Sequence, residues 1–292
     1  MKKVLSAFIW TISKIIGRKN LERVLIYSAK SVNINLHVHG LVQIGALNGF
    51  NQQINGERFL IEKILPDLCE NNAKLVFFDV GANVGEYALE LRRYFQNGEI
   101  HCFEPVKATF DTLVKNTNKH HITSHNIGFS NTTGKGKLFN TVNSTNTEIT
   151  SAYKDVFHEL FKNDDDIASI EFQMDTIDNF CDSAHITAID YLKIDVEGHE
   201  LSVLQGALNA LSNRRIKVIQ FEFNTHNVYS RVFLRDFYLI LNDFEFYRIL
   251  QNGIIKLGAY SPLNELFTLQ NIVAIRKDIC HLIKTKPLNL PY

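Results

Sequence analysis

The sequence predicts an α/β fold in which helices cover both faces of a mostly parallel sheet. From residue 75 onward, short apolar segments alternate with amphipathic ones, which is the order of repeated strand and helix units. The first apolar segment, LVFFDV (75–80), runs into the turn DVGANVGEY (79–87), and the second, EIHCFE (99–104), ends in an acid. This fold class binds its ligands at such turns, where parallel strands end.

Composition limits the class of protein before any motif is considered. The 292 residues, of which 45% are apolar, suffice for one large core and indicate a globular chain. Lys plus Arg and Asp plus Glu both total 31, and no run of five or six like charges occurs, so we expect no nucleic-acid partner. The four cysteines are far apart and lack metal-ligand spacing, which is typical of a reducing compartment. We therefore expect a cytoplasmic protein.

Residues 1–56 are predicted to form an extension that precedes the main domain. Lys14 interrupts the apolar stretch of MKKVLSAFIWTISKIIGRK, whereas a membrane span requires about 18 unbroken apolar residues. No small-x-small cleavage site of a signal peptide follows. An amphipathic helix fits this pattern, because apolar residues recur at helical spacing at Val4, Leu5, Phe8, Ile9, Ile12, Ile15 and Ile16.

Two interpretations of this apolar stripe stay open. The stripe can pack on the main domain, or it can lie on a membrane surface and make the protein membrane-associated. In the second case the basic residues Lys2, Lys3, Lys14, Arg18 and Lys19 would face anionic headgroups.

Beyond the helix, VNINLHVHG (32–40) alternates apolar and polar residues and predicts a half-buried strand. His37 and His39 would share a face of that strand, but no third ligand lies nearby in the sequence, so we expect no metal site. The segment GERFLIEKILPDLCENN (56–72) predicts a helix that leads into the main domain, which we expect to span 57–292.

The predicted elements of the main domain follow the strand and helix alternation. Asn252 and Gly253 suit a two-residue hairpin turn between FEFYRIL and IIKLGAY, so the sheet finishes with an antiparallel element. The Asn, Thr and Ser-rich stretch of about 129–170 is predicted to be a mobile insert at the mouth of the site. Strands are predicted at 75–80, 99–104, 188–196, 216–223 and 270–276, and helices at about 84–95, 106–119, 198–212 and 229–242.

The turn DVGANVGEY and the acid of CFEP predict a nucleoside-containing cofactor. Gly81 and Gly85 let the backbone approach a ligand, and the N–H groups of the following helix would point at it. Asp79 would repel a pyrophosphate and suits a cationic amino group, while Glu104, 19 residues after Gly85, can accept both ribose hydroxyls. The glycines follow G-x-x-x-G rather than the G-x-G-x-x-G of dinucleotide sites. S-adenosylmethionine fits this pattern better than NAD.

A third stretch, YLKIDVEGHE (191–200), places polar residues on a strand whose flanks predict a central position. Burial of Lys193 is costly unless an acid lies close, and Asp195 shares its face of the strand. The neighbouring strand QFEFN supplies Glu222, so polar groups of two strands should converge at the carboxyl end of the sheet. A buried ion-pair network that only fixes register is the structural alternative for Lys193 and Glu222.

Taken together, DVGANVGEY, CFEP, TIDNF and YLKIDVEGHE resemble the FkbM-type family of S-adenosylmethionine-dependent methyltransferases over roughly residues 57–276. The resemblance implies a class I methyltransferase fold, which is Rossmann-like, with a seven-stranded sheet and one antiparallel strand. It also implies O-methylation of a hydroxyl on a sugar, glycan or natural product. By position, it assigns Asp79, Gly81, Asn83, Gly85 and Glu104 to the cofactor and Lys193, Asp195, Glu197 and Gly198 to the region of the reacting methyl.

Two departures from the family pattern concern the adenine pocket and the acceptor. Gly128 in NIGFSN stands where the family pattern predicts Ala. The insert that follows is polar and has little of the expected apolar anchor.

Methyl transfer to a hydroxyl requires a base that accepts its proton. Asp195 is the first candidate. His199 is the second, because a histidine at the start of a helix stays neutral in the positive end of the dipole.

Two alternative functions share the predicted fold. A NAD(P)-dependent oxidoreductase or epimerase would carry a Tyr-x-x-x-Lys pair, and none of the ten tyrosines has a lysine four residues later. A non-catalytic binding protein is expected to have lost Asp79, Glu104 or Asp195, and all three are present.

Overall fold

The computed structural model describes residues 2–48, 55–69, 74–141, 150–159 and 167–289. The chain divides into two compact units, Met1–Ile44 and Gly45–Tyr292. Each unit is described by itself. Among the described residues, no helix has both the length and the apolar character needed to cross a membrane.

The N-terminal unit is helical. α1 (Lys2–Ile16) confirms the predicted amphipathic helix, and Gly17, with φ of 80°, separates it from α2 (Arg18–Ser31). The predicted strand at 32–40 is wrong, because residues 36–40 belong to α3 (Leu36–Gln43) and residues 32–35 connect α2 to it. The Asn35 side chain accepts the N–H groups of His37 and Val38 at 3.1 and 3.2 Å and so caps this helix. Two positions apart on a helix, His37 and His39 no longer share a face.

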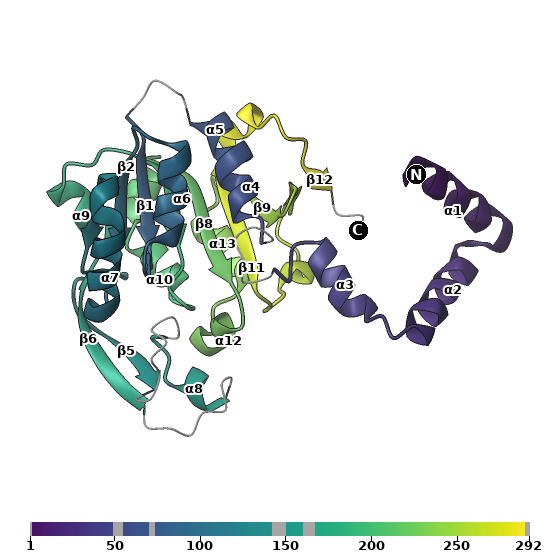
Figure 1. The fold of residues 1–292 in the computed structure, drawn as a ribbon, viewed down its shortest axis with the longest axis horizontal. Coiled ribbons are helices and arrows are strands. Elements are labelled where there is room, and N and C mark those ends of the chain that lie inside the picture. The colour runs from purple at the N-terminus through teal and green to yellow at the C-terminus, as the bar shows by residue number, and fades with distance from the viewer. Residues whose placement is uncertain (1, 49–54, 70–73, 142–149, 160–166, 290–292) are drawn as a thin grey trace. The chain divides into compact units, whose positions relative to one another are not determined.

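The larger unit is built on a twisted central sheet (Figure 1). In the described part of the chain this sheet has nine strands rather than the seven expected, in the order β12-β10-β9-β11-β8-β7-β1-β2-β3. β11 is antiparallel to both of its neighbours, and β10 and β12 extend the sheet beyond β9. β9 and β10 form the predicted hairpin, but its turn residues are Gln251 and Asn252, one position earlier than predicted, because Gly253 already pairs with Leu250. The strands are β1 (Val76–Val80), β2 (Glu99–Phe103), β3 (Ile122–His125), β7 (Ile189–Ile194), β8 (Ile216–Phe223), β9 (Phe244–Leu250), β10 (Gly253–Lys256), β11 (Gln270–Arg276) and β12 (Leu288–Asn289).

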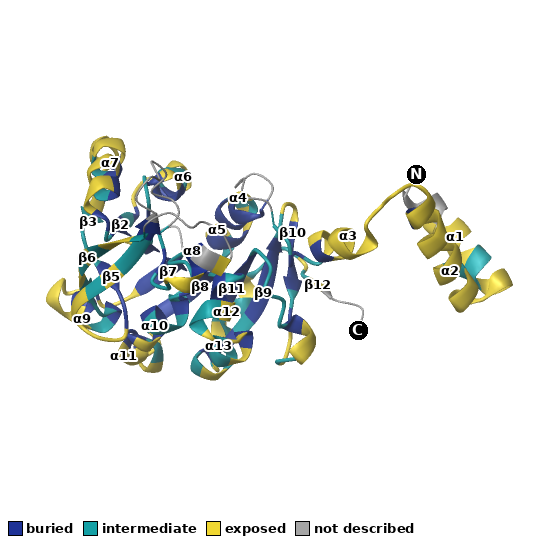
Figure 2. Cartoon of the chain, turned by 90° about the horizontal axis from the view of Figure 1, so that it is seen from below, coloured by how far each residue is buried: buried dark blue, intermediate teal, exposed yellow. Residues whose placement is uncertain are grey.

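Helices cover both faces of the sheet and enclose two apolar cores (Figure 2). Successive side chains of a strand point to opposite faces, so Phe77 joins one core and Phe78 the other. One face carries α4 (Glu57–Phe59), a π-helical turn (Leu60–Ile64), α5 (Leu65–Leu68), α6 (Glu86–Tyr94) and α7 (Lys107–Thr117). The other carries α9 (Ile177–Ser183), α10 (Glu200–Gln205), α11 (Leu208–Ser212) and α13 (Leu234–Ile240).

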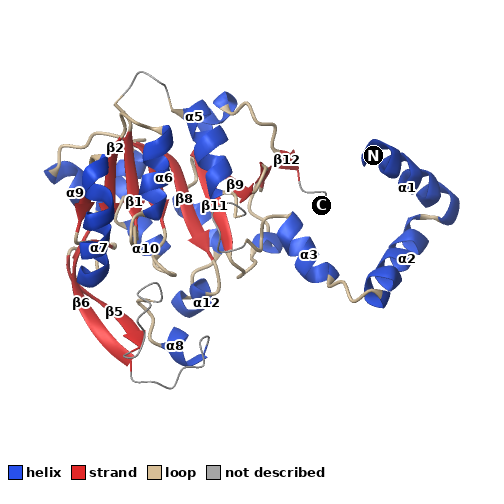
Figure 3. Ribbon diagram, in the orientation of Figure 1, coloured by secondary structure: helices blue, strands red, loops and turns tan. Residues whose placement is uncertain are grey.

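The described part of the predicted insert contributes to a second, smaller sheet of the order β4-β6-β5. The two long strands of this sheet, β5 and β6, are labelled in Figure 3. β5 (Gly134–Thr141) and β6 (Ile167–Asp175) pair antiparallel along their length, and β4 (Gly128–Phe129) pairs with the end of β6. The acidic run at 164–166 lies outside the described residues, and the predicted mobility of the insert stays a prediction. The remaining helices are α8 (Asp155–Glu159), α12 (His226–Ser230) and the 3₁₀ turns η2 (Asn118–His120), η3 (Pro262–Asn264) and η4 (Lys277–Leu282).

Candidate active site

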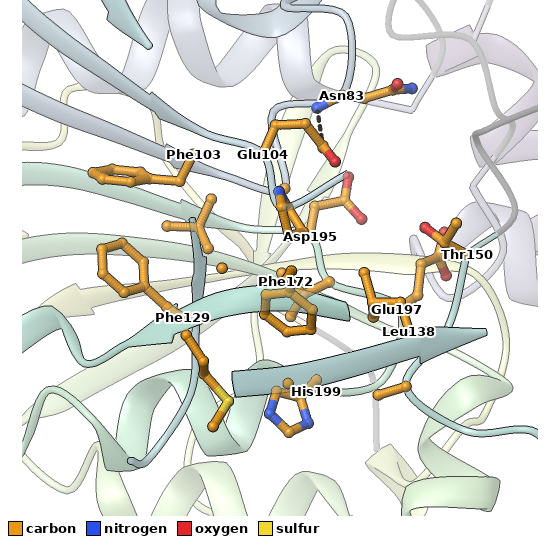
Figure 4. Close-up of a pocket in the computed structure, with 18 of the residues that line it drawn as sticks. Asn83, Phe103, Glu104, Phe129, Leu138, Thr150, Phe172, Asp195, Glu197 and His199 are labelled. Carbon is orange, nitrogen blue, oxygen red and sulfur yellow. Dashed lines mark hydrogen bonds between the residues drawn. The ribbon is translucent and has the colours of Figure 1, made fainter. Parts of the chain in front are cut away.

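A pocket of about 280 Å³ lies where the strand order reverses, since β1 has β2 on one side and β7 on the other. Ligands of open α/β sheets bind at such a switch point, beyond the carboxyl ends of the strands. The strand ends form one wall of the pocket and the β5–β6 hairpin forms the opposite one (Figure 4). The predicted residues Gly81, Asn83, Glu104, Asp195, Glu197 and His199 all line it.

The turn after β1 needs its glycines for two different reasons. At Gly81, where φ is 81°, an added Cβ would lie 1.8 Å from the backbone oxygen of Asp195, so only glycine lets this turn approach β7. At Gly85, which precedes α6 with φ of 89°, an added Cβ would come within 2.8 Å of Leu113 and Thr117. Gly85 therefore serves the packing of α6 on α7, and it does not belong to the pocket lining.

Glu104 presents a carboxylate at the pocket wall immediately after β2. Its two oxygens accept the N–H groups of Val106 at 2.8 Å and Asn83 at 3.2 Å. Burial nevertheless raises the pKa of Glu104 to about 7, because these backbone donors offset only part of the cost of removing the charge from water. Hydroxyl groups of a bound ribose would add donors to the ionised form.

Lys193 is buried between two acids, as the sequence predicts for a central strand. Its Nζ donates to Asp195 Oδ2 at 2.8 Å and lies 3.9 Å from Asp79 Oδ1 and 4.9 Å from the centre of the Tyr87 ring. Burial opposes ionisation of Lys193, but the carboxylates of Asp195 and Asp79 outweigh it and raise the pKa. Lys193 thus fixes the orientation of Asp195, which lines the pocket.

Asp79 lies behind the pocket wall and does not belong to its lining. The side chain is fully buried, and burial raises its pKa to about 6 although Lys193 favours the charged form. Neither carboxylate oxygen has a hydrogen-bond donor among the described residues. Contact between Asp79 and a cationic amino group stays a prediction.

The turn between β7 and α10 holds two residues in left-handed backbone conformations. Glu197 has φ of 52° and Gly198 has φ of 95°. Glu200 stabilises this turn, because its Oε1 accepts the N–H groups of Val196 and Gly198 at 3.2 and 3.0 Å. Full burial raises the pKa of Glu200 to about 7. The sequence motifs did not predict this role of Glu200.

Three carboxylates of two strand ends converge beside the pocket, as the sequence predicts for β7 and β8. One oxygen each of Asp195, Glu197 and Glu222 lies within 4.8 Å of the others. Hard divalent cations prefer such oxygen ligands. Each acid also has a protein partner: Lys193 for Asp195, Asn224 Nδ2 at 2.6 Å for Glu222, and His226 Nδ1 at 2.8 Å for Glu197.

His226 was not predicted from the sequence, because its partner Glu197 follows a different strand, β7. Burial opposes protonation of its ring, but the hydrogen bond and the charge of Glu197 outweigh burial and raise the pKa.

His199 faces the pocket from the position before α10, the helix start that the sequence predicts. Its Nε2 makes a hydrogen bond of 2.9 Å with Ser130 Oγ, and its Nδ1 lies 3.5 Å from the hydroxyl of Tyr153. Burial lowers the pKa of His199 below its ordinary value, so the ring is neutral at pH 7. Ser130 and Tyr153 could not be found from sequence, because both lie in the insert far from His199 in the chain.

Phe172 of β6 explains the unexpected glycine at position 128. A Cβ at Gly128 would lie 2.5 Å from the Phe172 ring, and a Cβ at Gly136 would lie 2.4 Å from it. The ring therefore occupies the space that alanine would need, and it lines the pocket together with Phe129 (Figure 4). Phe172 follows the insert predicted at about 129–170 and adds an apolar side chain to the pocket wall.

The sheet order around β1 and the pocket at its switch point define a class I methyltransferase fold. A family model described as Methyltransferase FkbM domain matches residues 79–251, more than half of the chain. The chain therefore belongs to the FkbM methyltransferase family. The predicted resemblance and fold class are confirmed, with the sheet two strands larger than expected.

Two curated proteins are similar to this chain at low identity. Hexuronic acid methyltransferase AglP of Haloferax volcanii is 24% identical over 169 residues, which cover 58% of this chain and 64% of that protein. Methyltransferase 1 of Beauveria bassiana is 25% identical over 164 residues, which cover 51% of this chain and 66% of that protein. The chain thus spans less than two thirds of either relative. The solved FkbM methyltransferase of Methylobacillus flagellatus KT is 16% identical, with a TM-score of 0.41, covering 70% of this chain and 45% of that one.

S-adenosylmethionine is the methyl donor of this family's domain, which confirms the predicted cofactor. The pocket fits such a group: Glu104 offers a carboxylate for two vicinal hydroxyls, and Gly81 leaves the wall free of a side chain. Phe103 and Phe129 add apolar surface on the same side.

Proposed function

We propose that this protein transfers the methyl group of S-adenosylmethionine to a hydroxyl of a sugar, glycan or natural-product acceptor. The observation that carries the proposal is the joint lining of one pocket by Glu104 and by two groups able to accept a proton, Asp195 and His199. The similarity to hexuronic acid methyltransferase AglP supports an acidic sugar as the first acceptor to test.

The chain's own residues have three tasks in this reaction. S-adenosylmethionine supplies an activated methyl carbon when bound, so the protein chiefly aligns the acceptor oxygen and removes its proton. Glu104, Asn83 and Gly81 would bind the donor, and the hairpin residues Phe172 and Leu138 would exclude water from the pocket.

We propose Asp195 as the base that accepts the hydroxyl proton. Lys193 holds its carboxylate by a 2.8 Å hydrogen bond through one oxygen, which leaves the other oxygen available to the acceptor. Glu197 lines the pocket beside it and would accept a hydrogen bond from a second acceptor hydroxyl. His199 is the alternative base.

Calorimetric titration with S-adenosylhomocysteine and with NAD tests the donor site. We expect the wild type to bind S-adenosylhomocysteine and not NAD, and Glu104→Ala to lose that binding, because the ribose contact and two backbone hydrogen bonds disappear together. Glu171→Ala on the exposed face of β6 is the matched control and should bind as the wild type does. Preference for NAD would overturn the methyltransferase proposal for this chain.

The acceptor is tested with glucuronic and galacturonic acids and their glycosides, with mass spectrometry of the products. A methyl ether formed on a hydroxyl survives mild alkali, whereas a methyl ester formed on the carboxylate is hydrolysed. An alkali-stable product supports the proposal. An alkali-labile product would mean that the acceptor group is a carboxylate, so Asp195 would have no proton to remove.

A further inference from the structure

The N-terminal unit, residues 1–44, has an apolar surface that its own helices leave uncovered. Among its described residues, Ala29 and Leu41 are the apolar ones that are buried. The exposed fraction is 61% at Phe8, 77% at Ile15 and 72% at Tyr27. Large apolar side chains are also exposed at Ile9, Trp10, Ile16, Val24, Leu25, Ile26, Val32, Ile34, Leu36, Val38 and Val42. Exposure of this many large apolar side chains in one unit indicates a surface that docks on a partner.

The same unit has a net charge, although the formal net charge of the whole chain is zero. Seven of the 31 Lys and Arg residues and one of the 31 Asp and Glu residues lie in 1–44. This unit therefore carries a formal charge of +6, and residues 45–292 carry −6. Its single acid, Glu22, is paired with Arg18 at 2.9 Å. A surface that is apolar and strongly cationic suits an occupant that is apolar and anionic.

In α1 one face is apolar, and the basic side chain Lys14 lies on a different face of the helix. Phe8, Ile12 and Ile15 follow one another at the spacing of a single helix face. Trp10 and Lys14 share a different face, with Lys14 Nζ 5.3 Å from the centre of the Trp10 ring. Tryptophan and lysine side chains of this kind prefer the level of lipid headgroups, above the acyl chains that receive the apolar face.

We propose that the N-terminal unit docks this protein on an anionic membrane surface. α1 has 15 residues and lies within the interface, because neither it nor any other described helix can span a bilayer. A second copy of the unit does not fit as occupant, since two +6 surfaces repel each other. A docked protein would present its catalytic pocket to acceptors at or near the membrane.

The test is flotation of the full chain with vesicles of phosphatidylcholine alone or mixed with phosphatidylglycerol. We expect flotation with the mixed vesicles at low salt and a strong loss of it at high salt or without phosphatidylglycerol. Trp10 is the sole tryptophan of the 292 residues, so its fluorescence reports on this unit alone. Its emission should shift to shorter wavelength when the mixed vesicles are added.

Variants separate the two contributions. Phe8→Asp with Ile15→Asp should abolish flotation, and Lys14→Gln should weaken the binding constant roughly fivefold, the loss expected for one cation near the surface. Leu263→Asp, at a 65% exposed apolar residue of η3, is the control and should float as the wild type does.

Three outcomes would overturn membrane docking: no flotation of the wild type, equal loss in Leu263→Asp, or a vesicle-independent dimer in sedimentation that Phe8→Asp dissolves. Titration with S-adenosylhomocysteine should be unchanged in all these variants. Flotation therefore reports on membrane binding, and titration reports separately on binding of the methyl donor.

Discussion

At the scale of single residues, the site contains several ionisable side chains whose pKa values burial has shifted from their ordinary values. Glu104 and Glu200 have pKa values raised to about 7 and Asp79 to about 6, while the pKa of His199 is lowered. Perturbed groups of this kind cluster where chemistry is performed. Lys193, whose pKa is raised by the carboxylates of Asp195 and Asp79, is the cation that those two acids share.

The choice between Asp195 and His199 as base can be decided by one pair of variants. If Asp195 is the base, Asp195→Asn should lower turnover about 10²-fold or more, with little change in S-adenosylhomocysteine affinity. His199→Gln should then cost less than about tenfold, since it loses only the contacts to Ser130 and Tyr153.

The pH dependence of turnover gives the independent check. The pKa of His199 lies below its ordinary value, so a reaction that needs the neutral ring loses rate only as the pH falls below about 6.5. Disappearance of that acidic limb in His199→Gln, together with the larger loss of turnover, would make His199 the base and contradict our assignment.

At the scale of elements, the sequence predicts strands better than it predicts what covers them. β8 and β11 have the predicted bounds, 216–223 and 270–276, because long apolar runs in a central sheet leave little freedom. The strand predicted at 32–40 is a loop followed by the start of α3, since alternation alone cannot show whether a partner strand exists. The pairing of Lys193 with Asp195 was predictable from spacing, whereas its approach to Asp79 required the β1–β7 register.

Much of the candidate site could be predicted because the motif residues lie at strand ends that meet. The rest depends on contacts between segments distant in sequence. Ser130 meets His199 across 69 residues, and the Phe172 ring fills the space beside Gly128 and Gly136. No local sequence pattern encodes such contacts. The pocket wall formed by β5 and β6 could therefore not be predicted from the sequence.

The turn between β7 and α10 gives a prediction at this scale. The pKa of Glu200 is about 7 in the folded chain against an ordinary value of 4.5, so the folded state holds this proton more tightly than the unfolded state. Wild-type stability therefore falls as the pH rises from about 4.5 to 7, by at most about 3 kcal/mol from this group. Glu200→Gln keeps an oxygen for the N–H groups of Val196 and Gly198 and carries no proton to lose.

Urea unfolding at pH 5 and pH 8 measures this effect. We expect the stability of Glu200→Gln relative to the wild type to improve between the two pH values, by up to about 3 kcal/mol. Glu171→Gln on the exposed face of β6 should show no such change. A difference between Glu200→Gln and the wild type that is independent of pH would mean that Glu200 ionises freely and that its burial does not affect the turn.

At the scale of the whole molecule, the chain combines a cationic helical unit with an anionic catalytic unit. The larger compact unit begins at Gly45, and the start of the main domain near residue 57 stays a prediction. Two contacts hold residues 45–48 to it: the Asn48 N–H donates to Leu269 O at 2.7 Å, and the Thr268 hydroxyl donates to Ala46 O. Residues 45–48 therefore belong to the larger unit.

Asn55 shows why the position of this boundary matters. Its side chain is buried, donates to Glu57 Oε2 at 2.9 Å and accepts the Glu57 N–H at 3.0 Å. Glu57 in turn accepts from Gln220 Nε2 at 2.8 Å, and Gln220 Oε1 accepts from the Tyr191 hydroxyl at 2.5 Å. This buried network lies directly beneath β7 and β8, so loss of Asn55 would leave Glu57 with fewer donors in the core.

Two truncations test the boundary. Removal of residues 1–44 should leave S-adenosylhomocysteine affinity within about twofold of the full chain, because the catalytic unit stays complete. Removal of residues 1–56 deletes Asn55 and the contacts of Ala46 and Asn48, and should lower the free energy of unfolding by about 1–3 kcal/mol for each buried polar partner lost. Thermal unfolding with and without S-adenosylhomocysteine measures both. Equal stability of the two truncated chains would place the boundary near residue 57 instead, and loss of binding on removal of 1–44 would mean that the N-terminal unit takes part in the site.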